Sequence, residues 1–416
     1  MNEVRNVLVG FVLGREESQI SYYDRRAGQP VQVPTKLGTN LFSFPTAIAK
    51  IRGKEEWHFG HEAAFAGREK DGEVVEGLYD IFCQNTPVWV DGKDVSPVDL
   101  LAIYLRQALA LLGLRDILRS ISCIMFTTEE LSEGFVRNLR AALLNIGFSP
   151  EQFGLQDFME SFYHYTFRQS EDFFLANVAL FLFKGNHVEL RLLVEDKGVR
   201  PHTVMVERLP GVELPEEKEA RDEAFYRYAK KTFDEVRISG VFICGEGFDT
   251  EWSEISLPFL LSNRRRAFYG DNLFVEGACY AAVEKKERRK LRLRQYVSDS
   301  MVRVGVGMDM LLRGNPTYYP LIGSGINWFE AEESCEFLLD GRDFLLFSLR
   351  SIDGKNRSSR QMPLPGLPSH PDFMTRIRLS ARCLSPEVCE IVAEDLGFGG
   401  FFPSTHKVWR EELELL

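Results

Sequence analysis

The sequence predicts a mixed α/β unit built from two similar halves, followed by a separate antiparallel β domain. Three observations support this fold class. Apolar strand patterns alternate with helix patterns through most of the chain. A succession of hairpin-connected strands, a helix and a further strand occurs twice and restarts near Asn177. After the charged run 285–294, short strands, turns and prolines dominate.

The first half opens with a hairpin over Val9–Asp24, in which two apolar strands flank a turn at Gly14. Backbone N–H groups at such a glycine turn can bind an anion. Further strands are predicted within 41–50, 56–61 and 120–128, and helices from Glu62, over 97–113, over 131–145 and over 157–169. Ser96-Pro97 and Gly147 are the start and stop signals of two of these helices.

The second half is predicted to contain strands over 177–183, 187–196 and 203–210, a helix over 215–236, a strand over 238–248 and a helix over 276–289. The charged run 285–294 is most simply a helix end and linker, and contact with nucleic acid or an acidic partner is the alternative. Beyond it we expect strands, with a helix only at 408–416.

The composition restricts the class of protein. Of 416 residues 44% are hydrophobic, which is typical of a globular chain, and the net charge of -11 argues against nucleic acid as the main partner. The seven cysteines form no C-x-x-C pair, which favours a reduced setting. No signal peptide and no apolar run of about 20 residues are visible, so we expect a cytoplasmic protein with no membrane partner.

Several motifs together resemble the actin and DnaK-type heat-shock chaperone superfamily of ATPases. They are "FPTAIA" from Phe44, "FGHEAAF" from Phe59, "CIMFTTEELSEGFVRNLRAALLNIGF" from Cys123, "GVFICGEGF" from Gly240 and "FVEGACYAA" from Phe274. Their order and spacing resemble a bacterial, chaperone-like branch of that superfamily. The segment ending in "VAEDLGFGGF" is similar to the last strands of a chaperone peptide-binding domain.

The resemblance implies a two-lobed actin-like ATPase fold made of duplicated ribonuclease-H-like halves. It gives a first lobe at 1–172, a second lobe at 173–284 and a β-sandwich at 295–416. Only a short interval separates Leu182 from the strand at Ile238, so the second lobe is expected to lack the subdomain that the superfamily inserts there.

The resemblance also implies a site for ATP or ADP, with contacts from Gly14, Arg15, Glu160, Gly245, Glu246, Gly247 and Phe248. Glu160 is the only polar catalytic candidate that is retained. Val12 and Leu182 stand where the superfamily carries aspartates that hold Mg²⁺, and Phe65 stands near its lysine. We therefore expect little hydrolysis and doubtful Mg²⁺ binding.

The leading hypothesis is a non-hydrolysing, chaperone-like binding or scaffold protein whose β domain contacts a protein partner. The alternatives are an active Mg-ATP-dependent ATPase that recruits Glu16, Glu17, Glu246 and Asp249, and an actin-like filament protein. For Arg15 the alternative to phosphate binding is a surface ion pair with Glu16, Glu17 or Glu160.

Other residues have simpler explanations. His58 and His61 lack a third ligand and are not expected to bind metal. Cys244 and Cys279 are expected to pack in the core. Tyr318, Tyr319, Trp328 and Phe329 are expected in turns of the β domain, where aromatic side chains can anchor a protein contact.

Overall fold

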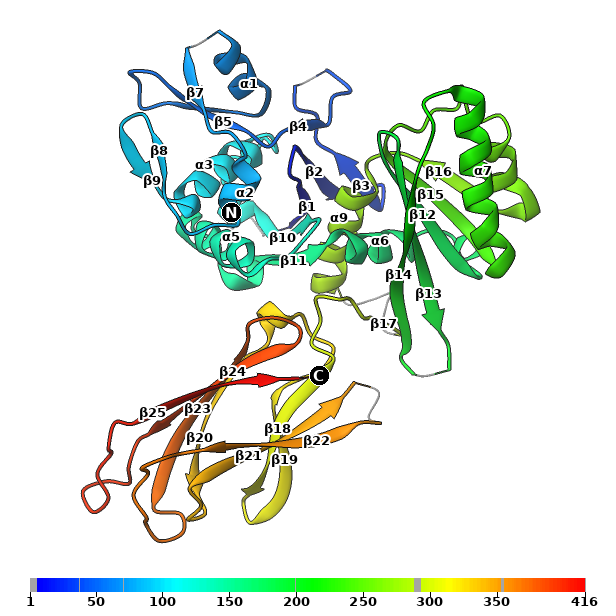
Figure 1. Cartoon of the computed structure of the whole chain (residues 1–416). Coiled ribbons are helices and arrows are strands. Elements are labelled where there is room, and N and C mark those ends of the chain that lie inside the picture. The colour runs from blue at the N-terminus through cyan, green and yellow to red at the C-terminus, as the bar shows by residue number, and fades with distance from the viewer. Residues whose placement is uncertain are drawn as a thin grey trace. The chain divides into compact units, whose positions relative to one another are not determined.

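The computed structural model describes residues 6–36, 38–69, 71–198, 200–287, 293–352 and 355–415. It is a mixed α/β protein with several sheets, and the chain divides into two compact units, Met1–Ser298 and Asp299–Leu416. Figure 1 shows the elements of both units. We describe each unit by itself.

The first unit contains a six-stranded sheet that we call the first sheet. Its main strand order is β11 (Phe153–Asp157), β10 (Ile121–Thr128), β1 (Val7–Leu13), β2 (Glu17–Asp24) and β3 (Gln29–Gln32), and β4 (Ser43–Pro45) pairs with β2. β1 runs parallel to β10, and β10 runs parallel to β11, whereas the β1–β2 and β2–β3 pairs are antiparallel. The predicted first hairpin is confirmed.

A second six-stranded sheet of the same unit is called the second sheet. Its order is β16 (Arg266–Tyr269), β15 (Ile238–Glu246), β12 (Asn177–Lys184), β13 (His187–Asp196), β14 (His202–Glu213) and β17 (Arg294–Tyr296). β12, β15 and β16 are parallel, and the β12–β13 and β13–β14 pairs are antiparallel. If β4 and β17 are left out and the other five strands of each sheet are numbered along the chain, both sheets share the order 5-4-1-2-3 and the same directions.

Helices follow equivalent strands in the two halves. In the first half they are α1 (Gly60–Arg68), α2 (Leu78–Phe82), α3 (Pro97–Ala110), α4 (Ile117–Ser120), α5 (Glu133–Ile146) and α6 (Phe158–Thr166). In the second they are α7 (Lys218–Glu235), α8 (Ser256–Leu261) and α9 (Leu273–Glu287). α6 follows the fifth strand of the first sheet, and α9 follows the fifth strand of the second. The sequence missed β16 and α8 in the second half and, among others, β3, α2 and α4 in the first.

Local signals explain the helix boundaries. The Ser96 side chain accepts the Asp99 N–H at the start of α3, with Pro97 in the first turn, as predicted. Ser132 caps α5 in the same way, and Gly147 ends it in the left-handed region. α1 begins at Gly60, two residues earlier than predicted. Small sheets of β5 (Ile48–Ile51), β6 (Trp57–Phe59) and β7 (Gly72–Val74), and of β8 (Val88–Val90) and β9 (Lys93–Val95), complete the first half.

The helix α9 packs on the first sheet. Small residues of α9, among them Ala278 and Ala282, lie against Leu8 and Met125 in one buried cluster. Past Glu287, residues 288–292 of the charged run lie outside the described residues. The chain is next seen as β17, which pairs in parallel with β14. Within the described residues, the charged run predicted as a helix end and linker therefore begins in α9 and ends in β17.

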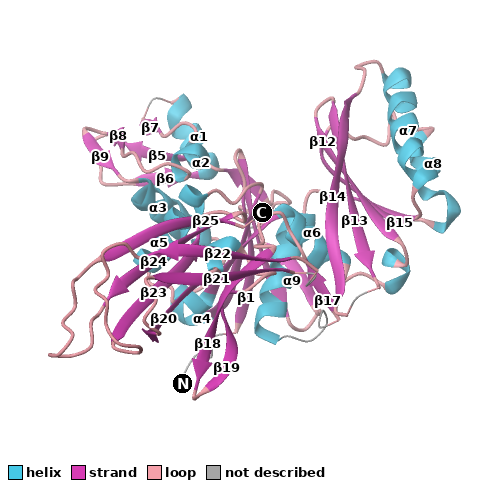
Figure 2. Cartoon of the chain, turned by 60° about the horizontal axis from the view of Figure 1, so that its bottom comes forward, coloured by secondary structure: helices cyan, strands magenta, loops and turns pink. Residues whose placement is uncertain are grey.

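The second unit consists of two four-stranded antiparallel sheets (Figure 2). One has the order β19 (Asn315–Ile322), β18 (Val304–Leu312), β21 (Phe344–Ser351), β22 (Arg357–Pro363), and the other β20 (Glu332–Leu339), β23 (Thr375–Cys383), β24 (Val388–Asp395), β25 (Val408–Glu414). The helix predicted at 408–416 is wrong: Val408–Glu414 is a strand. Trp409 and Leu413 are buried, and their spacing of four suits the alternation of a strand as well as a helix turn.

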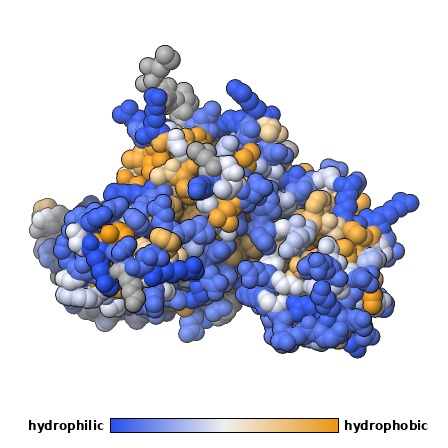
Figure 3. All heavy atoms as spheres, turned by 90° about the horizontal axis from the view of Figure 1, so that it is seen from above, coloured by the Kyte–Doolittle hydropathy of each residue, from blue (hydrophilic) through white to orange (hydrophobic). Residues whose placement is uncertain are grey.

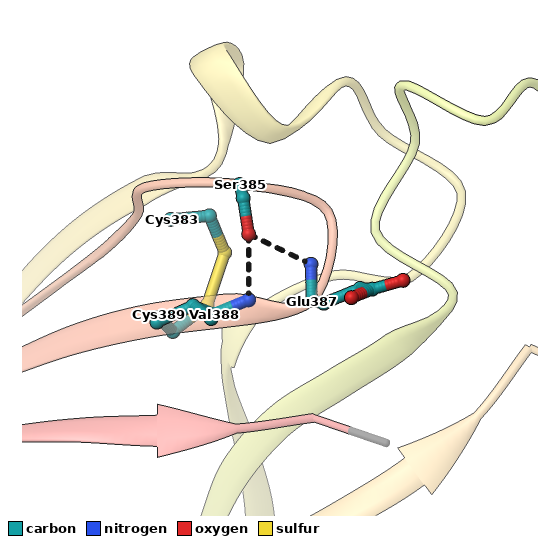
Figure 4. Close-up of a disulfide and its surroundings, with 5 residues drawn as sticks. All are labelled: Cys383, Ser385, Glu387, Val388 and Cys389. Atoms are coloured by element: carbon teal, nitrogen blue, oxygen red, sulfur yellow. Dashed lines mark hydrogen bonds between the residues drawn. A yellow bond between two sulfur atoms is a disulfide. The ribbon is translucent and has the colours of Figure 1, made fainter.

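Two cysteines of this unit form a disulfide. Cys383 and Cys389 lie opposite each other on β23 and β24 and are bonded through sulfur, while Ser385 accepts the Glu387 and Val388 N–H groups in the connecting turn (Figure 4). The other five cysteines are free. The sequence-based expectation of reduced cysteines is therefore not met at this pair, because pairing depends on strand register, which the spacing of the cysteines does not disclose.

Hydrophilic residues cover much of the surface seen from above, and apolar areas on it are interrupted (Figure 3). Among the described residues, no helix is both long enough and apolar enough to cross a membrane.

Candidate functional site

The carboxyl ends of three parallel strands lie at one edge of the first sheet. β1 ends at Leu13, β10 at Thr128 and β11 at Asp157. In open α/β sheets ligands bind at this kind of edge, because loops and helix starts converge there. The predicted residues Gly14, Arg15 and Glu160 directly follow two of these strands, so they belong to one candidate edge.

Gly14 makes the turn of the first hairpin. Its N–H donates to the Glu17 carbonyl at 3.2 Å, and its carbonyl accepts the Thr46 hydroxyl at 2.8 Å. A Cβ on Gly14 would overlap the Glu17 carbonyl oxygen, so only glycine fits this turn. Both backbone polar groups of Gly14 are therefore engaged within the protein.

Arg15 has a partner that the sequence did not suggest. Its guanidinium forms an ion pair with Asp80 of α2 and lies over the Tyr79 ring, 5.2 Å from the centroid. Asp80 raises the pKa of Arg15 through a hydrogen bond and charge attraction. The Tyr79 hydroxyl is 2.7 Å from the Thr128 hydroxyl at the end of β10, and burial raises the pKa of Tyr79 to about 12. The predicted pairing of Arg15 with Glu16, Glu17 or Glu160 is wrong.

Val12 lies in the core of the first sheet and is 8% exposed. Its neighbour on β10 is Thr127, whose hydroxyl accepts a hydrogen bond from Ser161 at 2.8 Å. The Gln156 amide donates to the Ser161 hydroxyl at 2.6 Å. The polar groups beside Val12 are thus hydroxyls and an amide, which are weak ligands for Mg²⁺ compared with carboxylates.

The carboxylate at the end of β11 is Asp157, whereas the sequence prediction chose Glu160. Asp157 is 9% exposed and accepts the Glu160 N–H at 2.7 Å as the cap of α6. Glu160 lies in the first turn of α6, with its carboxylate 4.0 Å from His164 Nε2. The sequence did carry the signal, because an aspartate three residues before a glutamate at a helix start is typical of a cap.

The second sheet has an equivalent edge at the carboxyl ends of β12, β15 and β16. Gly245 and Glu246 are the last two residues of β15 and Gly247 begins the turn after it, and both glycines have positive φ, +90° and +119°. The Gly245 N–H donates to Asp271 Oδ1 at 2.7 Å. Phe248 points into the core, 5% exposed, among Phe183, Phe225 and Trp252. The structure therefore places Gly245 and Glu246 at the end of β15, Gly247 in the turn and Phe248 in the interior.

Arg221 of α7 holds this edge together, and sequence reasoning missed it. Its guanidinium donates to Asn186 Oδ1 at 2.6 Å and to the carbonyls of Gly185 at 2.7 Å, Gly247 at 3.1 Å and Pro215 at 3.3 Å. It also lies 5.1 Å from the Trp252 ring centroid. In the described part of the chain no carboxylate pairs with Arg221. Burial lowers its pKa. The residue joins the β12–β13 turn to the Gly247 turn.

The remaining candidates lie elsewhere. His58 Nε2 lies 3.2 Å from Glu56 Oε1, and His61 Nε2 lies 3.2 Å from the Ser43 carbonyl oxygen. Within the residues that the structure describes, no group of three His, Cys, Asp or Glu side chains could hold a metal ion. Glu16, Glu17, Glu246 and Asp249 are exposed. Phe65 is 63% exposed, on α1.

The aromatic residues of the second unit differ from expectation. Trp328 and Phe329 form a short 3₁₀ turn but are each 7% exposed, and their rings pack edge to face. Tyr318 and Tyr319 lie on β19 instead of in a turn. Trp328 and Phe329 therefore belong to the interior of this unit and do not offer an exposed anchor.

The fold and edges define a mixed α/β protein with two topologically equivalent sheets and a β-sandwich-like second unit. Residues 29–299 match the model described as "Family of unknown function (DUF5716) C-terminal", and residues 301–415 match "Domain of unknown function (DUF8552)". The first match covers well over half of the chain, so the protein belongs to the DUF5716 family. The boundary between the matches coincides with that between the two units. A search of curated proteins found no match.

Proposed function

We propose that the chain is a chaperone-like protein with the two-lobed architecture of the actin and DnaK-type superfamily, a degenerate nucleotide site and a scaffold role. The observation that carries the proposal is the equivalence of Val12 and Leu182. Each is the sixth residue of the first strand in a sheet, and the two sheets share strand order and directions. This duplication supports two similar lobes, and an apolar residue stands at the same point in both.

Valine and leucine remove the chemistry that phosphoryl transfer requires. In the superfamily, as the resemblance implies, aspartates at these positions hold Mg²⁺ through water. Metal ions neutralise the charge that develops on the phosphate oxygens, and alkyl side chains cannot hold them. Loss of one electrostatic element of this kind costs about 10²–10³ in rate. Hydrolysis at background level follows from the proposal.

Nucleotide binding is weak in this proposal because the available donors are already engaged. Arg15 is paired with Asp80, and the Gly245 N–H is bonded to Asp271. A phosphate would have to displace a carboxylate at either position. The scaffold role rests on the second unit, for which we propose a protein partner.

A second candidate, an active Mg-ATP-dependent ATPase, is favoured by one observation. Asp157 is a buried carboxylate at the carboxyl end of β11, where parallel strands gather ligands. In that case Asp157 would have to hold Mg²⁺ as well as cap α6.

The experiment measures ATP turnover by the full chain with Mg²⁺ and with EDTA, and binding of ATP and ADP by calorimetry. We expect background turnover. The double variant Val12→Asp/Leu182→Asp should gain Mg-dependent ATP affinity, whereas the matched Val12→Asn/Leu182→Asn control, equally polar but uncharged, should not. Turnover that EDTA abolishes would overturn the proposal, and its loss in Asp157→Asn would then establish the second candidate.

A further inference from the structure

Two arginines of the second unit lie directly opposite each other on one face of a sheet. Arg350 of β21 is the register partner of Arg357 of β22. Alternate residues of β21, Leu345, Phe347 and Leu349, are at most 3% exposed and face the core. Arg350 therefore points to the outer face, and Arg357 points to the same side because register partners share a face.

This pair lacks a neutralising group. Like charges placed directly opposite on a sheet are destabilising. Neither arginine has a carboxylate within ion-pair distance in the part of the chain that the structure describes. Asp309 lies on the same face, opposite Tyr318, but forms no ion pair with either arginine. The face therefore carries an uncompensated pair of positive charges on a chain whose net charge is -11.

Arg350 is held in position by aromatic stacking. Its guanidinium carbon lies 3.3 Å from the centroid of the Tyr318 ring. That ring covers Gly307 of β18, where a Cβ would overlap it. A guanidinium fixed in this way loses little conformational freedom when it binds an anion.

On the other sheet of the unit, outward-facing arginines are paired with glutamates. On its outer face Arg378 lies 2.9 Å from Glu336 and 3.0 Å from Glu394, and Arg382 lies 2.7 Å from Glu390. Arginines on an edge strand also discourage strand addition, which accounts for Arg357 on the outer strand β22. That explanation does not extend to Arg350, because β21 is an interior strand.

We propose that the outer face of the sheet β19-β18-β21-β22 binds an acidic segment of a protein partner through Arg350 and Arg357. Guanidinium groups pair with carboxylates through two parallel hydrogen bonds, so two adjacent arginines select closely spaced carboxylates. The Ser348 and Ser359 pair is next along the same face and adds hydroxyl donors. This inference names the partner class of the proposed scaffold role and rests on that role.

The test uses the full chain and a fluorescein-labelled decaglutamate peptide, with anisotropy measured in about 50 mM and about 300 mM salt. We expect binding that weakens with salt and that falls by about tenfold or more in Arg350→Gln/Arg357→Gln. The matched control, Arg378→Gln/Arg410→Gln on the other sheet, should change affinity by less than about twofold. Circular dichroism checks that both variants are folded.

Three results would overturn the inference: no decaglutamate binding by the unsubstituted chain, equal losses in both double variants, or binding of polyphosphate without decaglutamate. Dimerisation in light scattering that the first double variant abolishes would assign the face to a second copy instead. ATP turnover on the same preparation tests the scaffold proposal separately, since hydrolysis would refute that proposal whether or not the peptide binds.

Discussion

Gly277 of α9 lies against Ser161 of α6 with backbone touching backbone, so that a Cβ at position 277 would overlap the Ser161 carbonyl oxygen. Gly10 of β1 approaches α9 in the same way, because a Cβ there would overlap the Val275 carbonyl and the Cys279 N–H. α6 continues from the first sheet and α9 from the second. These close approaches therefore fix how the two halves of the first unit are joined.

Gly277→Ala should destabilise the protein, although it replaces glycine inside a helix. Helix propensity alone would stabilise by about 1 kcal/mol, whereas overpacking costs about 1–3 kcal/mol. Urea unfolding of the full chain measures the sign of the change in the free energy of unfolding. Gly400→Ala is the control, because no heavy atom lies within 4 Å of its added Cβ. A gain of stability in Gly277→Ala would contradict the close packing of α6 on α9.

Arg221→Met should loosen both turns of the second edge. It removes four hydrogen bonds from a side chain that is 7% exposed, which costs on the order of 3 kcal/mol. Arg221→Lys should recover only part of the lost stability, since one ammonium group cannot reach all four acceptors. Hydrogen exchange at the Gly185 N–H, which donates to the Glu246 carbonyl, should accelerate. Arg227→Met, exposed on the same helix, should leave exchange unchanged.

Stability should fall in acid because of His164. Burial, and then the Arg168 charge, lowers the pKa of His164 to about 3, from 6.5, despite Glu160 nearby. The unfolded chain therefore binds more protons between these values, so folding stability is lost as pH falls through about 6.5.

Between about pH 7.5 and pH 5 the free energy of unfolding should fall by about 2 kcal/mol less in His164→Gln than in the unsubstituted protein. Urea unfolding at both pH values measures it, with exposed His406→Gln as the control. An unchanged pH dependence would show that folding does not lower the pKa of His164.

The Cys383–Cys389 disulfide predicts a thiol count. Denatured, unreduced protein should react at five cysteines, and reduced protein at seven. Cys389→Ala should lower the stability of the second unit by about 2 kcal/mol, since the closed loop is short. Seven reactive thiols without reduction would show that the two cysteines are free in the protein.

The sequence by itself determined the elements that depend on local patterns. Apolar alternation located the first hairpin and β12, and Ser96-Pro97 and Gly147 marked helix ends through local backbone and side-chain preferences. It also identified Val12 and Leu182 as apolar residues in equivalent strands, because repeated order along a chain is visible without coordinates. It failed at 408–416, where a spacing of four fits strand and helix alike.

Only the tertiary structure decided which residues meet. Asp80 is 65 positions from Arg15, and Arg221 reaches turns 26 and 36 positions away. Register brings Arg350 opposite Arg357 and Cys383 opposite Cys389. Such contacts depend on how strands pair and helices pack, and a shift of one residue in register would move each side chain to the other face. For that physical reason local sequence patterns could specify the strands and helices, but not the partners of their side chains.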